Sequence, residues 1–168
     1  MPAVGARPLL MVDVDGVISL FSFDFGARPE GRFHSIDGIP HFLSSRAASH
    51  LLELWTTFEL VWASGWEEKA NEHLPHLLGL PGPLPYLSFE RAPGRANAHW
   101  KLEAIDTYAG SRPLAWIDDA FNDACHQWAA ARQAPTLLVQ TEPDEGLTPR
   151  EAQTLRLWAS ALARQSTH

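Results

Sequence analysis

The most constraining feature of the sequence is a short apolar segment that ends in two aspartates. Residues 9–12 are all apolar and are followed by Asp13-Val14-Asp15-Gly16. An apolar run that is bounded in this way predicts a strand, over residues 9–14, that is buried in a parallel sheet. Side chains alternate along a strand, so Asp13 and Asp15 begin on the same side. Two adjacent carboxylates repel each other, and the pair therefore requires a cation nearby.

Strand-like and helix-like segments alternate along the rest of the chain. We expect strands at residues 59–64, 113–117 and 136–140, and helices at 44–57, 66–79, 100–108, 120–133 and 148–163. Pro75 should break or kink the second of these helices, and Gly79 should end it. The last helix has a capping-box start, with Thr148, Pro149 and Glu151 in sequence. This alternation predicts an α/β fold with a mostly parallel central sheet.

Length and composition indicate a single domain spanning residues 1–168. The net charge of -7 gives no support for broad binding to nucleic acid or membranes, although a local basic patch stays open. Cys125 is the only cysteine, which excludes an intramolecular disulfide. No apolar run has the length of a membrane span, and Asp13 and Asp15 interrupt the N-terminal one. We therefore expect a cytoplasmic protein with no membrane partner; nothing in the sequence indicates its oligomeric state.

Polar residues follow three of the predicted strands. Asp13 and Asp15 end the first, Ser64 the second, and Asp118 with Asp119 the third. In an open parallel sheet, ligands bind at the carboxyl ends of the strands, so these side chains should meet at one edge. Converging carboxylates with hard oxygen ligands favour Mg²⁺. Mg²⁺ binds with substrate phosphates, which points to phosphoryl transfer through an aspartyl-phosphate.

A lysine could complete such a site by binding the phosphoryl oxygens. Lys101 begins a predicted helix and is our first candidate, with Lys69 as the alternative. Ser64 could donate a hydrogen bond to the same group, or it could only cap the following helix.

The order of these parts resembles the haloacid dehalogenase-like (HAD) superfamily of hydrolases. The family's first motif corresponds to residues 13–16 and its second to residues 61–64, which end in Ser64. Its lone lysine corresponds to Lys101, and its acidic fourth motif to residues 116–123. The resemblance implies a Rossmann-like three-layer sandwich, a Mg²⁺ cofactor and phosphatase activity.

The resemblance also implies a role for each matching residue. Asp13 would be the nucleophile and a metal ligand, and Asp15 the general acid and base that also offers its backbone carbonyl to the metal. Ser64 and Lys101 would hold the phosphoryl oxygens. Asp118 or Asp119 would complete the metal site, with Asp119 favoured by the motif register. Asp123 would orient Lys101 or a metal-bound water, unless it is an ordinary charge on a helix surface.

Only short segments occupy the places where family members often carry a cap domain. We expect a minimal flap at residues 17–43, in which residues 17–21 and 31–36 could pair as a hairpin. An open site suits a large phosphorylated substrate such as a nucleic-acid end, and the chain resembles the small HAD domains of nucleic-acid repair systems. The nearby arginines could form a basic rim or be solvated loop charges: Arg28, Arg32, Arg91 and Arg95. Trp66 and Trp100 could also face a substrate.

Two other functions stay open at this stage. The first is a phosphatase of small nucleotides or sugar phosphates. The second is a module that binds a phosphorylated partner with little turnover, which would have no need of the acid and base at Asp15.

Overall fold

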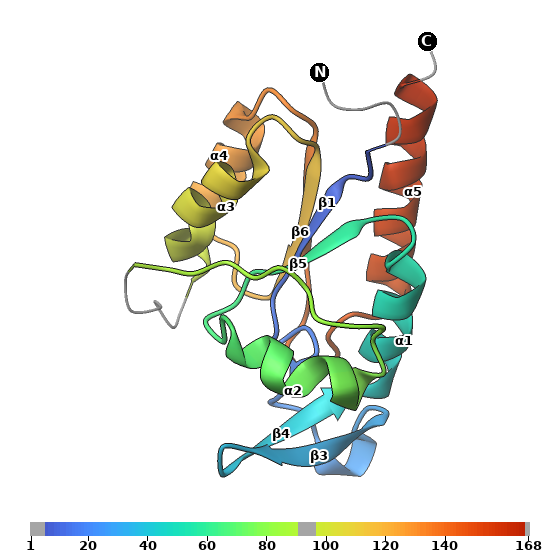
Figure 1. Ribbon diagram of the computed structural model, residues 1–168. Coiled ribbons are helices and arrows are strands. Elements are labelled where there is room, and N and C mark those ends of the chain that lie inside the picture. Colours follow the sequence, from blue (N-terminus) through green and yellow to red (C-terminus); the bar gives the residue numbers. More distant parts are fainter. Residues whose placement is uncertain (1–5, 91–96, 167–168) are drawn as a thin grey trace.

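A four-stranded parallel sheet forms the centre of the molecule, in the order β5-β1-β6-β7 (Figure 1). The computed structural model describes residues 6–90 and 97–166. The strands are β1 (Leu9–Val12), β5 (Glu59–Trp62), β6 (Leu114–Asp118) and β7 (Thr136–Gln140). β1 lies between β5 and β6, in a register that places Val12 beside both Trp62 and Ile117. The carboxyl ends of these three strands therefore lie together, as the sequence predicts.

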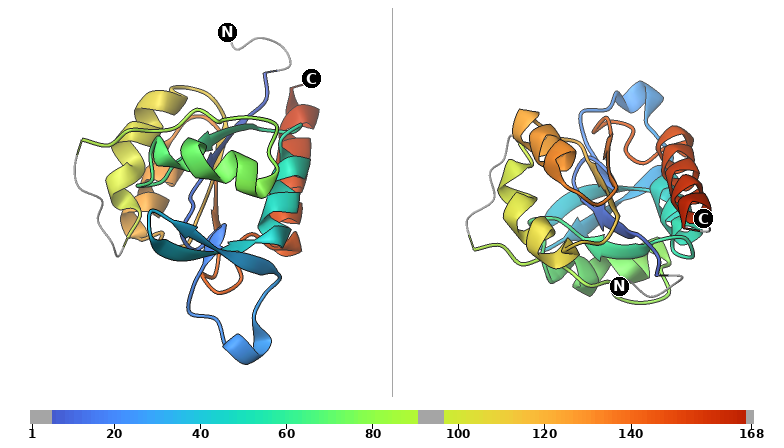
Figure 2. Two further views of the ribbon diagram at one scale, coloured as in Figure 1. Left: turned by 60° about the horizontal axis from the view of Figure 1, so that its bottom comes forward. Right: turned by 90° about the horizontal axis from the view of Figure 1, so that it is seen from above.

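Helices cover both faces of this sheet (Figures 1 and 2). The first face packs against α1 (Ser45–Leu54), α2 (Lys69–Leu78) and α5 (Pro149–Gln165). The second packs against α3 (Leu102–Ala109) and α4 (Asp123–Ala131). Along β1, Leu10 and Val12 enter the first core, whereas Leu9 and Met11 enter the second. This alternation, with every residue of β1 buried, confirms the three-layer α/β sandwich.

Capping residues fix several helix ends where the sequence predicts them. The Ser44 hydroxyl accepts a hydrogen bond from the Ala47 N–H and begins α1. Thr148 and Glu151 form the capping box of α5. Gly79 ends α2 in the left-handed region, with φ 72°.

Pro75 does not break its helix, and the alternative of a kink there stays a prediction. α2 begins only at Lys69 and continues past Pro75 to Leu78. A proline removes one backbone hydrogen bond, but Leu74 and Leu78 on either side are buried in the core and hold this turn against the sheet.

A small antiparallel sheet stands at the carboxyl end of the main sheet and forms the flap (Figure 2). It has the order β2-β4-β3, with β2 (Ser19–Leu20), β3 (Gly31–Ile36) and β4 (Ile39–Ser44). The 3₁₀ turn η1 (Phe25–Ala27) lies in the loop between β2 and β3.

The predicted pairing of residues 17–21 with 31–36 is wrong, because β4 lies between β2 and β3. Asp37 and Gly38 form a tight turn with φ values of 53° and 79°, so β3 pairs with the strand that follows it at once. β2 is then left to pair with the other edge of β4.

The segment between α2 and the 3₁₀ turn η2 (His99–Lys101) has no helix and no named strand in its described residues, 79–90 and 97–98. Its described residues contribute one isolated bridge to the sheet, between Tyr86 and Trp62. The turn η2 then leads into α3. None of the helices described is both long enough and apolar enough to cross a membrane.

Candidate active site

A buried lysine joins two of the predicted acidic residues at the end of the sheet. The Lys101 ammonium donates to Asp13 Oδ1 at 3.0 Å and to Asp118 Oδ2 at 2.6 Å. The lysine is 3% exposed, and both of the aspartates are buried. η2 positions the lysine, and β1 and β6 position the two carboxylates, so residues far apart in sequence meet here as predicted.

Asp119 completes this group of charges, which we name the acid–lysine cluster (Asp13, Lys101, Asp118 and Asp119). Carboxylate oxygens of the three aspartates lie within 4.8 Å of one another. Asp118 also accepts from the Ala120 N–H at 3.0 Å, so both of its oxygens have donors. Asp119 is half-buried and is the freer carboxylate of that pair.

Gly16 allows Asp119 to sit against the first motif. A Cβ atom at residue 16 would lie 2.2 Å from Asp119 Oδ2, and the backbone there has φ +81°. Thr141 holds the same turn, because its hydroxyl donates to the Gly16 carbonyl at 2.8 Å. The glycine of the first motif is therefore required both by its backbone conformation and by the space that Asp119 occupies.

Negative charge exceeds positive charge in the cluster. Burial raises the pKa of Asp13 well above its ordinary value; Asp118 and Asp119 add to this rise and Lys101 opposes it. Burial and the neighbouring Asp118 raise the pKa of Asp119 to about 6. Burial alone would lower the pKa of Lys101, but Asp13 and Asp118 together raise it, so the lysine stays charged. One ammonium faces three carboxylates, and the site therefore favours a further cation.

Ser64 follows β5, which pairs with β1 on the side opposite β6. The Ala63 N–H donates to the Val12 carbonyl at 2.8 Å, which continues the β1–β5 pairing to the end of the strand. The Ser64 side chain is buried, and its hydroxyl oxygen accepts from the Trp66 N–H at 3.2 Å. It therefore caps the turn at residues 65–68, and the alternative that Ser64 caps the next helix is wrong, because α2 has Glu68 as its N-cap. A hydroxyl that accepts one hydrogen bond keeps its own hydrogen for donation.

Asp15 is exposed and is held by a residue whose role the sequence did not specify. Trp66 Nε1 donates to Asp15 Oδ2 at 3.1 Å. The Trp66 ring also packs against His41 of the flap, with ring centroids 4.9 Å apart, and His41 contacts the Ser19 hydroxyl at 3.2 Å. That Trp66 faces a substrate stays a prediction. Its contact with Asp15 joins residues distant in sequence and leaves no local signal.

Other predicted residues lie outside the acid–lysine cluster. Lys69 pairs with Asp37 at 3.1 Å on the surface, so Lys101 is the lysine that enters the site. Asp123 is exposed at the first turn of α4, whereas Asp118 is the residue that orients Lys101. Within the described ranges Asp123 has no hydrogen bond or ion pair, and its role toward a metal-bound water stays a prediction. Arg91 and Arg95 lie outside the described residues.

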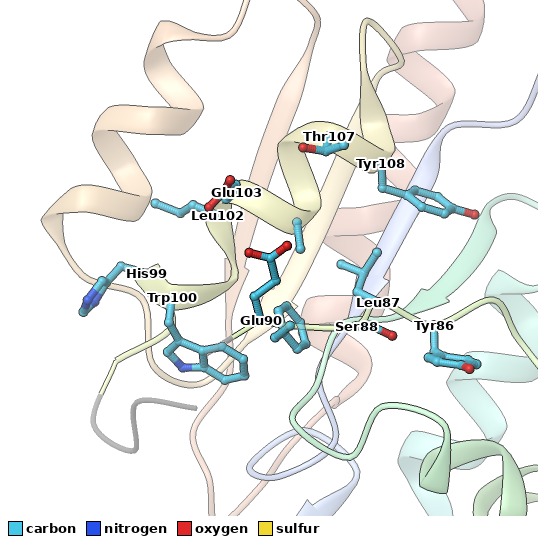
Figure 3. Close-up of a pocket in the computed structure, with 12 residues that line it drawn as sticks. Tyr86, Leu87, Ser88, Glu90, His99, Trp100, Leu102, Glu103, Thr107 and Tyr108 are labelled. Atoms are coloured by element: carbon cyan, nitrogen blue, oxygen red, sulfur yellow. The ribbon is translucent and has the colours of Figure 1, made fainter. Parts of the chain in front are cut away.

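A cavity of about 840 Å³ lies between residues 86–90 and α3 (Figure 3), and the acid–lysine cluster does not line it. Trp100 lines it and packs against Phe89, with ring centroids 4.6 Å apart. Trp100 therefore faces this cavity, whereas its neighbour Lys101 enters the cluster.

One family of known proteins matches most of the chain. The family described as "HAD domain in Swiss Army Knife RNA repair proteins" matches residues 9–152. Among solved structures, a hypothetical protein from Xanthomonas campestris has a TM-score of 0.47 and 16% identity, with 94% of this chain and 88% of that chain covered. The comparison with curated proteins gave no match. The matched residues include every motif described above, and the chain belongs to the family of HAD domains found in Swiss Army Knife RNA repair proteins.

Proposed function

We propose that this protein is a Mg²⁺-dependent phosphatase that works through an aspartyl-phosphate on Asp13. Family membership implies activity of the hydrolase or phosphatase type. The observation that carries the finer proposal is the contact of Lys101 with Asp13 and Asp118, with Asp119 close by. We further propose that the chain acts as one HAD-like domain in which the flap replaces a cap.

In the first step, an oxygen of Asp13 attacks the phosphorus of the substrate. The bond between phosphorus and the leaving oxygen breaks, and the carboxyl group of Asp15 gives its proton to that oxygen. Lys101 and Ser64 bind the phosphoryl oxygens as negative charge shifts onto them. Trp66 holds Asp15 through its N–H, and the exposure of Asp15 leaves it accessible to a bound substrate.

In the second step, water attacks the phosphorus of the aspartyl-phosphate. Asp15, now ionised, takes a proton from that water, and the bond between Asp13 and phosphorus breaks. Inorganic phosphate leaves, and both carboxyl groups return to their starting states. General acid and base catalysis of this kind contributes about 10²–10⁴-fold to the rate.

The donor set of the cluster fits Mg²⁺. Its oxygens belong to three carboxylates within 4.8 Å, and they outnumber the single ammonium. The ion would be held by Asp13, Asp119 and the backbone carbonyl of Asp15. Asp118 would be shared between the ion and Lys101. When bound, Mg²⁺ supplies positive charge that favours ionised carboxylates and stabilises the phosphoryl oxygens.

A nucleic-acid end is the substrate that the chain's features favour. The family name refers to RNA repair. The flap spans only the segment from β2 to β4, and a site without a folded cap admits the end of a long substrate. We therefore propose removal of a terminal phosphate from a polynucleotide.

The experiment is a substrate panel with matched variants. We expect Mg²⁺-dependent release of phosphate from an aryl phosphate and from 3′- or 5′-phosphorylated oligonucleotides, and its loss in Asp13→Asn. The matched control is Asp123→Asn, which removes a nearby exposed carboxylate and should reduce activity far less. Activity that survives both EDTA and Asp13→Asn would contradict the mechanism. A preference for mononucleotides or sugar phosphates would contradict the polynucleotide substrate, and tight binding without turnover would indicate a binding module.

A further inference from the structure

The flap carries five phenylalanines that the proposed chemistry does not use, and four of them contact one another: Phe23, Phe25, Phe33 and Phe42. Phe42 is buried, and Phe23 and Phe33 lie against it with ring centroids 4.8 and 5.1 Å away. Phe25 and Phe33 have ring planes only 14° apart and centroids separated by 6.4 Å. Phe25 is 73% exposed and Phe33 is 47% exposed. We name this group the phenylalanine cluster; large apolar side chains gathered at a surface usually mark a binding site.

A cavity of about 310 Å³ connects the phenylalanine cluster to Asp15. All four rings of the cluster line it together with a fifth, Phe21, and so does His41, the flap residue that packs against Trp66. Asp15 is the one carboxylate that lines it within the described ranges. In the proposed reaction Asp15 protonates the leaving oxygen, so the group attached to that oxygen lies on the Asp15 side of the site. The cavity therefore begins at Asp15, where the group attached to the leaving oxygen would lie.

We propose that this cavity binds the base of the nucleotide whose terminal phosphate is removed, and that it thereby selects single-stranded ends. The inference rests on the proposed function and names its substrate class. The cavity volume is at the lower limit for small-molecule sites and suits one nucleoside. Phenyl rings stack on every base, because each base has a π-face, so little base preference is expected. A paired base at a duplex end is stacked on the next base pair, and this stacking and the pairing must break before the base can enter the cavity. Single-stranded ends are therefore favoured.

The flap also carries two arginines outside the phenylalanine cluster. Arg28 follows η1, and Arg32 precedes Phe33 in β3. Both are exposed, and in the described part of the chain neither side chain makes an ion pair or hydrogen bond, whereas Arg46 approaches Glu30 at 3.8 Å. Side chains alternate along a strand, so Arg32 points to the face opposite Phe33, whereas Arg28 adjoins the turn that carries Phe25. We therefore assign to Arg28 the contact with a backbone phosphate beyond the terminal nucleotide. Binding of a single strand should therefore weaken as salt increases.

The test compares flap variants on substrates with and without a base. Phe33→Ala should lower kcat/KM for a phosphorylated single-stranded oligonucleotide about tenfold through KM, the loss expected when one stacking ring is removed. Hydrolysis of acetyl phosphate, which has no ring, should not change. Phe33→Trp should retain the activity on the oligonucleotide, and Phe25→Ala, at a position that is mostly exposed, should repeat the loss without affecting the fold. Leu157→Ala, an exposed apolar residue of α5, is the matched control.

Several results would overturn the inference. One is an equal loss of activity on acetyl phosphate and on the oligonucleotide in Phe33→Ala. Another is an unchanged rate on the oligonucleotide in both Phe33→Ala and Phe25→Ala. A third is an equal rate of the wild-type protein on a single strand and on a blunt duplex. Faster, Phe33-dependent hydrolysis of a phosphotyrosine peptide would assign the cavity to a protein substrate and would also overturn it.

A binding measurement separates this inference from the proposed function. The phosphorylated oligonucleotide, with a fluorescent label, is titrated into Asp13→Asn with and without Phe33→Ala, and its anisotropy is followed. If the wild-type protein hydrolyses none of the substrates, the proposed function fails. Binding that Phe33→Ala weakens about tenfold would still support the cavity, whereas binding that it leaves unchanged would overturn it.

Discussion

The acid–lysine cluster and the phenylalanine cluster lie at the same end of the sheet, but they are built in opposite ways. The first buries charged groups, with Lys101 3% exposed between two aspartates. The second exposes apolar groups, with Phe25 73% exposed on a turn of the flap. Charge is concentrated in a buried site of low dielectric, where electrostatic interactions are strong, and the proposed reaction would use them on a phosphoryl group. Apolar surface is left in water, where a bound base can cover it.

This difference separates the chemistry of the protein from its choice of substrate. Main-sheet strands and η2 position the acid–lysine cluster, so changes there should affect every phosphate ester. The flap positions the phenylalanine cluster, so changes there should affect only esters that carry a base. Trp66 lies between these regions, because it contacts Asp15 of the first motif on one side and His41 of the flap on the other.

The largest effect is expected when the buried lysine loses its charge. Lys101→Met leaves Asp13 and Asp118 without their ammonium partner, and it removes a ligand of the phosphoryl group. We expect kcat/KM to fall at least about 10³-fold on every substrate, because oxyanion stabilisation by one donor contributes about 10²–10³-fold and the nucleophile is also disturbed. Steady-state kinetics on acetyl phosphate and on an oligonucleotide measure this loss.

Lys69→Met is the matched control for this variant. Lys69 is exposed and pairs with Asp37, and exposed pairs contribute about 0–1 kcal/mol to stability. A rate for Lys101→Met within a few fold of the wild-type rate would show that Lys101 is not part of the reaction.

A smaller effect is expected at the residue that joins the two regions. Trp66→Phe keeps a ring against His41 but removes the N–H that holds Asp15. A hydrogen bond of this kind contributes about 1 kcal/mol, so kcat should fall roughly fivefold with little change in KM. The loss should be similar for oligonucleotides and small alkyl phosphates. A change confined to the KM for oligonucleotides would instead place Trp66 with the phenylalanine cluster.

The smallest expected effect is a change in the free energy of unfolding with pH. It arises in the acid–lysine cluster, so changes in the phenylalanine cluster should not affect it. Asp119 has a pKa of about 6 in the folded protein, against an ordinary value of 3.8. Between these pH values the folded state binds the proton more tightly than the unfolded state. In EDTA, the free energy of unfolding should therefore decrease as the pH rises from about 4 to about 6.

Denaturant titrations over this pH range, for the wild-type protein and for Asp119→Asn, measure the slope. The slope should be smaller in the variant, and Phe33→Ala should leave it unchanged. Equal slopes in wild-type protein and Asp119→Asn would contradict the raised pKa. Added Mg²⁺ should stabilise the wild-type protein more above pH 6 than near pH 4, because protons compete for its ligands.

The sequence predicts the acid–lysine cluster better than it predicts the flap, and the reason is topological. Asp13, Ser64 and Asp118 each follow an apolar strand, and parallel strands bring their carboxyl ends together without further information. Lys101 could be expected from its place in the order of motifs. That Asp118 rather than Asp123 holds the lysine could not be predicted, because it depends on side-chain distances within the folded site.

The flap is less predictable because its strands are short and its contacts are tertiary. β2 has two residues and no periodic pattern, so its pairing with β4 left no signal in the sequence. The contacts between Phe23, Phe33 and Phe42 depend on that pairing. The same is true of His41, which reaches Trp66 only once β4 is in place.

The most direct test of the central claim is the mass of intact Asp15→Asn after mixing with Mg²⁺ and an aryl phosphate. An aryl oxide leaves without help from an acid, so the first step should proceed, whereas the second step lacks its base and should slow about 10²–10⁴-fold. We predict that the protein accumulates with one added phosphoryl group, located on Asp13, and that Asp13→Asn combined with Asp15→Asn carries none. An unmodified Asp15→Asn protein that turns over at the wild-type rate, or a phosphoryl group on another residue, would contradict the account.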